Sequence, residues 1–246
     1  MASISRYVRD YGNKTFFEEP FNEIDNVVFS SLIYLNYEGI VPENRKYIRL
    51  EEAGIKYLEK YSYFEISKLG IAQKVSYQLL KQVVNTVRYK DVLMYNFKYI
   101  ADSDRQFGAV CFKVKKNFTY VAFEGTDNLL SGWKEDFELS YKFPVPAQTL
   151  AIEYINKRVR FYDKNVMVGG HSKGGNLALV SSMFAKKFVN KKIKKIYSND
   201  GPGLRKAEIE SDNYKRVRDR LIHIVPNYSY IGVLLRNDKF KVIKST

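Results

Sequence analysis

The sequence predicts an α/β fold with a mostly parallel central sheet and helices on both faces. Strand-like and helix-like segments alternate through its second half, and one serine between two glycines lies where a strand-like segment gives way to a helix-like one. Such alternation is typical of parallel sheets, because each crossover helix covers a sheet face. No Pro/Gly-rich linker interrupts the 246 residues. We therefore expect one domain over 1–246, with a helical N-terminal region (1–90) packed on a sheet-bearing core (91–246).

The N-terminal region is expected to be mostly helical. Its first 20 residues are polar and irregular, which indicates a loosely held arm. A helix follows Pro20 with Asn22 as its N-cap, because apolar residues recur at i, i+3 and i+4 over 24–35. Apolar spacing also predicts helices at 50–61 and 71–87.

The core is expected to begin with a hairpin and to continue with alternating elements. Its strands are rich in β-branched and aromatic residues and are bounded by turn residues. Strands are predicted at 92–100, 108–114, 118–123, 165–168, 193–198 and 221–225. Helices are predicted at 129–141, 147–162, 175–189 and, with a polar sequence, 205–220.

The strongest chemical signal is a Gly-x-Ser-x-Gly segment between an apolar strand and a helix, Gly170-His171-Ser172-Lys173-Gly174. A sharp strand-to-helix turn would lift the Ser172 hydroxyl above the sheet, and the two glycines would keep side chains away from it. The Lys173 amide would point at a developing oxyanion. This arrangement predicts the α/β-hydrolase fold, with Ser172 as nucleophile and His171 bracing the turn.

The acid and the base of a catalytic triad are less clearly marked. Asp200 follows the next strand, so it would lie at the same sheet edge as Ser172 and could orient a histidine. It could also only brace the Gly201-Pro202 turn. His223 is the sole histidine after Asp200, but it falls inside a predicted strand. Either His223 is the base, or the chain ends before its base.

Composition excludes several other classes of site. Cys111 is the single cysteine and there are two histidines, so neither a disulfide nor a metal site is expected. We also expect no cofactor. Neither a signal peptide nor a membrane span is recognisable, which favours the cytoplasm. The net charge of +14 would allow weak contact with anionic surfaces. Nothing resembles a nucleic-acid module, so no specific nucleic-acid partner is expected.

Several motifs carry a family resemblance that covers residues 21–235. The chain resembles the Mbeg-like family of bacterial α/β-hydrolases, and one of its loops is similar to class 3 lipases, although Glu124 stands where those usually carry arginine. The matching stretches are Phe21-Asn22-Glu23-Ile24-Asp25, Gly125-Thr126-Asp127, Gly132-Trp133-Lys134-Glu135-Asp136-Phe137, Gly170 through Asn176, and Ser198-Asn199-Asp200-Gly201-Pro202-Gly203.

The resemblance implies further roles. Thr126 would supply the second oxyanion amide, and Trp133 and Asp136 would belong to a lid over the cleft. In that family a histidine follows a final strand like residues 240–245. Together these features predict a serine hydrolase that cleaves a carboxylic ester, either a small-molecule ester or a lipid-like substrate, through an acyl-enzyme on Ser172. The alternative is a catalytically silent scaffold that binds a ligand or a protein.

Overall fold

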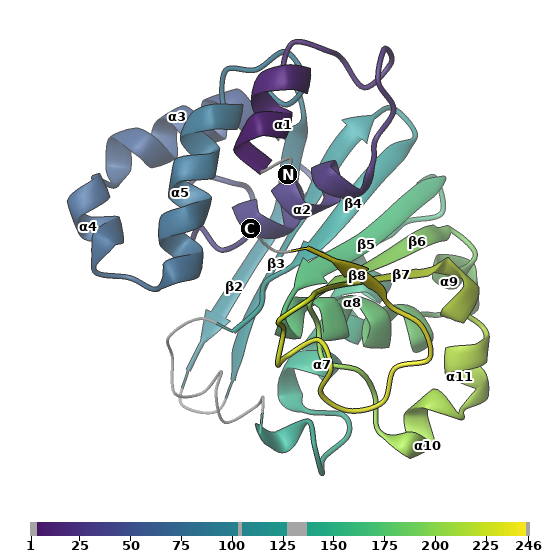
Figure 1. Cartoon of the computed structure of the whole chain (residues 1–246). Helices are drawn as coiled ribbons and strands as arrows, with labels where there is room; N and C mark the ends of the chain where they lie inside the picture. Colours follow the sequence, from purple (N-terminus) through teal and green to yellow (C-terminus); the bar gives the residue numbers. More distant parts are fainter. Residues whose placement is uncertain (1–3, 103–104, 127–136, 245–246) are drawn as a thin grey trace.

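A computed structural model describes residues 4–102, 105–126 and 137–244 (Figure 1). Its centre is an eight-stranded sheet whose strands follow one another in chain order. The strands are β1 Ile48–Arg49, β2 Leu93–Ala101, β3 Gln106–Lys115, β4 Phe118–Phe123, β5 Asn165–His171, β6 Ile193–Asn199, β7 Leu221–Pro226 and β8 Lys241–Ile243. Neighbours from β1 to β4 are antiparallel, and those from β4 to β8 are parallel. The predicted α/β class with a mostly parallel sheet is confirmed.

Helices cover both faces of this sheet. The N-terminal set is α1 Ile4–Tyr11, α2 Glu23–Leu32, α3 Leu50–Lys60, α4 Tyr63–Ser67 and α5 Ile71–Val83. The crossover set is α7 Pro146–Arg158, α8 Lys173–Met183, α9 Lys187–Asn190, α10 Lys206–Ile209, α11 Asp212–Lys215 and the 3₁₀ turn Arg218–Arg220. Because successive right-handed crossovers advance in one direction along the sheet, they place the crossover helices on one face. The N-terminal set covers the other face, as Figure 1 shows.

The side chains of strand β4 pack against the helices on both faces of the sheet. Tyr120 and Ala122 belong to the core under the N-terminal helices. Val121 and Phe123 belong to the core under α7 and α8. Successive strand side chains point to opposite faces, so a continuous apolar run suits a strand that is covered on both. The many tyrosines are mainly core residues of these two layers.

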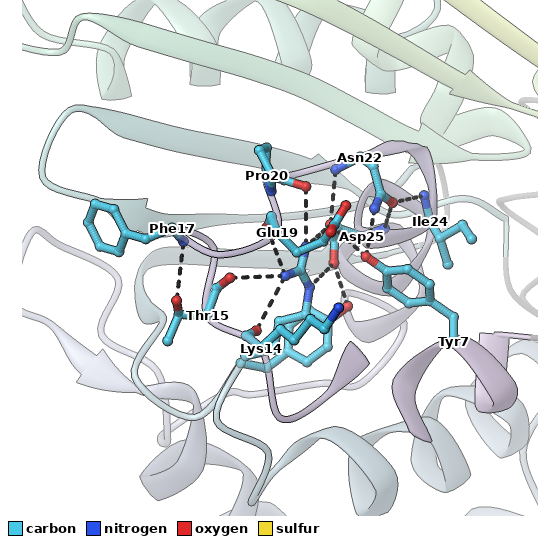
Figure 2. Close-up of polar contacts among 11 residues, drawn as sticks. Tyr7, Lys14, Thr15, Phe17, Glu19, Pro20, Asn22, Ile24 and Asp25 are labelled. Carbon is cyan, nitrogen blue, oxygen red and sulfur yellow. Dashed lines mark hydrogen bonds and ion pairs between the residues drawn. The ribbon is translucent and has the colours of Figure 1, made fainter. Parts of the chain in front are cut away.

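Residues 4–20 are not a loosely held arm, and for them that prediction is wrong. Arg88 is fully buried and forms an ion pair with Asp25 at 2.6 Å. Its guanidinium also donates to backbone carbonyls of the N-terminal segment, including that of Glu19 at 3.0 Å (Figure 2). Tyr7 packs beside this cluster, and burial raises the pKa of its hydroxyl to about 12. A buried charge must be solvated by protein groups, and the N-terminal segment supplies them.

Two predicted helices differ from the observed ones. The helix predicted at 71–87 ends at Val83, and its apolar residues Ile71 and Val75 are exposed. Its buried Ser76 faces α2 and donates to the Ser31 carbonyl at 2.6 Å. The polar helix predicted at 205–220 is divided into α10, α11 and a 3₁₀ turn. Ser211 interrupts it by capping α11 through a bond from the Tyr214 amide.

Candidate active site

Ser172 occupies a strained strand-to-helix turn between β5 and α8. Its φ of 55° and ψ of −131° are values that non-glycine residues rarely adopt. The flanking glycines are required by close packing. A Cβ on Gly170 would lie 2.4 Å from the Gly174 carbonyl carbon, and one on Gly174 would lie 2.3 Å from the Phe123 oxygen. The sequence motif is therefore explained by the geometry of the turn.

A buried polar network lies beneath this turn. The Ser172 amide donates to the Asn199 carbonyl at 2.9 Å. The Asn199 side chain donates to the Gly170 carbonyl at 3.2 Å and accepts a bond from Asn26 of α2 at 2.7 Å. Tyr120 donates to the Asn26 side-chain oxygen at 2.6 Å. Helix α2 is thereby tied, through Asn199, to the backbone at Gly170 and at Ser172. Sequence reasoning missed this network, although Asn26 and Asn199 adjoin the motif stretches.

A small apolar cavity of about 100 Å³ opens beside Ser172. Its walls come from four parts of the chain: the segment before α7, the start of α8, the loop after β6 and the C-terminal loop between β7 and β8. They are Leu139, Ser140, Ser172, Lys173, Pro202, Ile231, Leu234 and Leu235. Such a cavity can hold a short apolar group next to the serine hydroxyl.

The predicted oxyanion residues lie on both sides of the turn. Lys173 is the first residue of α8, so its amide lies at the helix N-terminus, where the helix dipole favours negative charge. Its side chain is buried, with Nζ 3.4 Å from the Gln106 carbonyl. Thr126 follows Gly125, which packs tightly against the His171 carbonyl. Thr126 therefore leaves β4 next to the turn. The predicted lid residues Trp133 and Asp136 lie outside the described residues.

Asp200 begins the loop after β6 and is turned toward the C-terminal loop. Its φ of 54° is again left-handed, and its amide donates to Ile224 of β7 at 2.7 Å. Its Oδ1 accepts hydrogen bonds from the Ser229 hydroxyl and from the Gly232 amide, the latter at 3.1 Å. The structure thus places Asp200 at the same sheet edge as Ser172, on the neighbouring strand. One carboxylate oxygen also fastens the loop that walls the apolar cavity.

His223 lies inside β7, as the sequence predicts. A carbonyl oxygen can only accept, so Nε2 of His223 donates to the Gly201 carbonyl at 3.0 Å. The ring is buried against Phe240, and this burial lowers the pKa of His223. The hydrogen bonds described for His223 join it to Gly201 and Asn237. This arrangement does not bring its imidazole onto the Ser172 hydroxyl.

His171 faces the N-terminal helices. Its Nδ1 is 2.9 Å from the Tyr34 hydroxyl, which agrees with the bracing role expected from its place before the serine. The side chain is accessible to solvent, yet protein surrounds it on most sides. Desolvation therefore lowers the pKa of His171, and the charge of Asp200 opposes that shift.

Neither a metal site nor a membrane-spanning helix is found in the described part of the chain. No three histidine, cysteine, aspartate or glutamate residues there are grouped so that they could hold a metal ion. No described helix is long and apolar enough to cross a membrane.

Comparisons with known proteins place the chain in a family. One similar solved structure is titled "Crystal structure of M37 lipase"; it is 14% identical, with 86% of this chain and 69% of that chain covered and a TM-score of 0.45. No curated protein matches the chain. The Mbeg1-like family model matches residues 83–246, which is more than half of the chain and includes Ser172, Asp200 and His223. The chain therefore belongs to the Mbeg1-like family.

Proposed function

We propose that this chain is a serine hydrolase that cleaves a carboxylic ester through an acyl-enzyme on Ser172. The observation that carries the proposal is the left-handed backbone of Ser172 at the mouth of an apolar cavity. Backbone strain of this kind is concentrated at functional sites, where it aims a side chain at a substrate. The small apolar cavity favours a short acyl group of a lipid-like ester.

In the proposed reaction the Ser172 hydroxyl oxygen attacks the ester carbonyl carbon. A general base takes the hydroxyl proton and passes it to the departing alcohol, which leaves an acyl-serine. The amides of Lys173 and Thr126 stabilise the oxyanion of each tetrahedral intermediate. Water then attacks the acyl carbonyl, loses its proton to the same base, and releases the acid and free Ser172. No cofactor takes part.

The base has two candidate sources. His223 would have to exchange its bond to Gly201 for one to Ser172. Alternatively, a histidine could follow β8 in a longer form of this chain. Because β8 runs parallel to β7, its carboxyl end at Ile243 lies at the sheet edge that holds Ser172. In either case Asp200 is the proposed acid, and its Ser229 contact keeps it at that edge.

A silent scaffold is the second candidate function. The observation that favours it is the hydrogen bond from His223 Nε2 to the Gly201 carbonyl. Because His223 is engaged there, no general base is positioned at Ser172 among the described residues. Without a base a serine hydroxyl is a weak nucleophile. Such a scaffold would bind an ester-like ligand in the same cavity without turning it over.

Turnover of p-nitrophenyl acetate and butyrate distinguishes these functions. We expect slow hydrolysis by the 246-residue chain, abolished in Ser172→Ala, and a rise of about 10²–10⁴-fold when a general base is restored, either by added imidazole or by a longer form of the chain. Loss of turnover in His223→Ala, with an unchanged melting temperature, would assign the base to His223. No Ser172-dependent turnover under any of these conditions would favour the scaffold and contradict the hydrolase.

A further inference from the structure

A second and larger cavity lies under the N-terminal helices, beside the strand-to-helix turn that carries Ser172. Its volume is about 380 Å³, within the range of small-molecule sites. Four of its lining residues are tyrosines: Tyr34, Tyr57, Tyr61 and Tyr99. Tyr34 also bonds to His171, the residue before Ser172. Figure 1 shows the helices that wall it, α3 to α5, gathered next to β2 and β3.

The charge of this tyrosine cavity is opposite to that of the whole chain. The protein carries 41 basic and 27 acidic residues, yet the charged residues that line the cavity are Glu65 and Glu124. Glu124 is only 4% exposed. Hydrogen bonds from the Ser62 amide and hydroxyl lower the pKa of Glu65, which keeps that carboxylate ionised. A cavity with two carboxylates and no lining base attracts cations.

The aromatic walls suit the same ligand. Tyr57 and Tyr61 lie with ring centroids 4.8 Å apart, and the faces of tyrosine rings attract cations. The protein has one such cation–π contact at the edge of the cavity, where the Lys60 ammonium lies 5.1 Å from the Tyr61 ring centroid. A desolvated cation against the face of such a ring gains more than an exposed one.

Gln73 supplies an independent indication of a ligand. It lines the cavity, is only 8% exposed, and its Oε1 is buried without a hydrogen-bond partner. Leaving a buried acceptor unpaired is costly, so such groups are expected to meet a donor. The donor that fits a cavity with two carboxylates is an ammonium N–H.

We propose that the tyrosine cavity binds a protonated organic amine, with the ammonium group against the faces of the tyrosine rings and an N–H donated to Gln73 Oε1. The binding itself is independent of the proposed hydrolase activity. If that activity also holds, the cavity next to His171 would receive an amino-alcohol part of the ester, while the smaller cavity receives the acyl group.

Ligand-detected NMR on the Ser172→Ala protein tests the binding without any catalysis. Butylammonium is expected to bind with a millimolar dissociation constant, which is reasonable for so small a ligand. Neutral 1-butanol and anionic butyrate of similar shape should bind at least about tenfold more weakly, because they lack the positive charge. Equal binding of butanol and butylammonium would contradict the proposal.

Variants locate the ligand. Gln73→Leu should weaken butylammonium binding about tenfold and leave tetramethylammonium, which has no N–H, unchanged. Tyr61→Leu should weaken both cations roughly three- to thirty-fold. Tyr228→Leu, at a tyrosine that is 81% exposed and outside the cavity, is the matched control. If folded Gln73→Leu and Tyr61→Leu proteins bind butylammonium like the control, the assignment is wrong.

Discussion

The two halves of the candidate site are held in different ways. On the nucleophile side, Ser172 rests on a fully buried network that reaches α2 through Asn199 and Asn26. On the acid side, Asp200 is fastened to the loop between β7 and β8 through Ser229, which is only partly buried, and Gly232. The N-terminal helices therefore help to hold the turn that carries Ser172. The C-terminal loop is instead held by Asp200 and by backbone bonds between Leu204 and Arg236.

The C-terminal loop that contacts Asp200 leads into an exposed strand, β8. All three residues of β8 are exposed, and its Lys241 reaches Glu23 of α2 at 2.8 Å across the surface. Tyr230, Val233 and Leu234 of the preceding loop are exposed as well. Exposed segments with few buried contacts open at low free-energy cost. We therefore expect substitutions on the nucleophile side to cost more stability than matched ones on the acid side.

The largest contrast is expected between two ion pairs that both involve α2. Arg88→Met leaves Asp25 buried without its partner, which should cost about 3–5 kcal/mol of unfolding free energy. Lys241→Met breaks the exposed pair with Glu23 and should cost less than about 1 kcal/mol. Urea unfolding of both proteins measures the difference. Equal costs would show that the N-terminal segment is not anchored by Arg88.

A smaller contrast concerns the hydrogen bonds of the two halves. Asn199→Leu removes the bonds to Asn26, Ser30 and Gly170 and should cost about 2–3 kcal/mol, because buried polar groups are left unsatisfied. Ser229→Ala, on the acid side, should cost about 1 kcal/mol or less. The same urea titrations apply. A larger loss in Ser229→Ala would reverse the comparison.

The smallest effect is a pH dependence of stability. Burial lowers the pKa of His223, so below the ordinary value of 6.5 the unfolded chain takes up a proton that the folded chain does not. Unfolding free energy should therefore fall as the pH is lowered from 7 toward 5, by at most about 1.4 kcal/mol per pH unit for this residue. His223→Gln should flatten the slope. A slope that the substitution leaves unchanged would assign it to other groups, among them His171, whose pKa is also lowered.

The sequence predicted the nucleophile side better than the acid side, for a physical reason. The turn at Ser172 needs glycines at fixed positions, and the β-branched strands around it are covered on both faces, so local pattern determines them. The alternation of strands β4 to β7 with helices and the N-cap of α2 at Asn22 were predictable on the same basis.

Long-range polar contacts could not be predicted in this way. The burial of Arg88 by the N-terminal segment and the pairing of Asn26 with Asn199, 173 positions apart, depend on tertiary structure. A polar N-terminal sequence therefore looked loosely held. The short element β1 and the direction of the Asp200 carboxylate also depend on neighbours that no sequence pattern identifies.

Covalent labelling by a fluorophosphonate tests the nucleophile assignment most directly. The labelling is followed by peptide mass spectrometry, with imidazole added as an external base so that the result does not depend on which histidine serves the enzyme. The account predicts one adduct, on the peptide that contains Ser172, and its loss in Ser172→Ala while Ser140→Ala, in the same cavity, still reacts. An adduct that persists in Ser172→Ala, or no adduct in the folded parent protein, would contradict it.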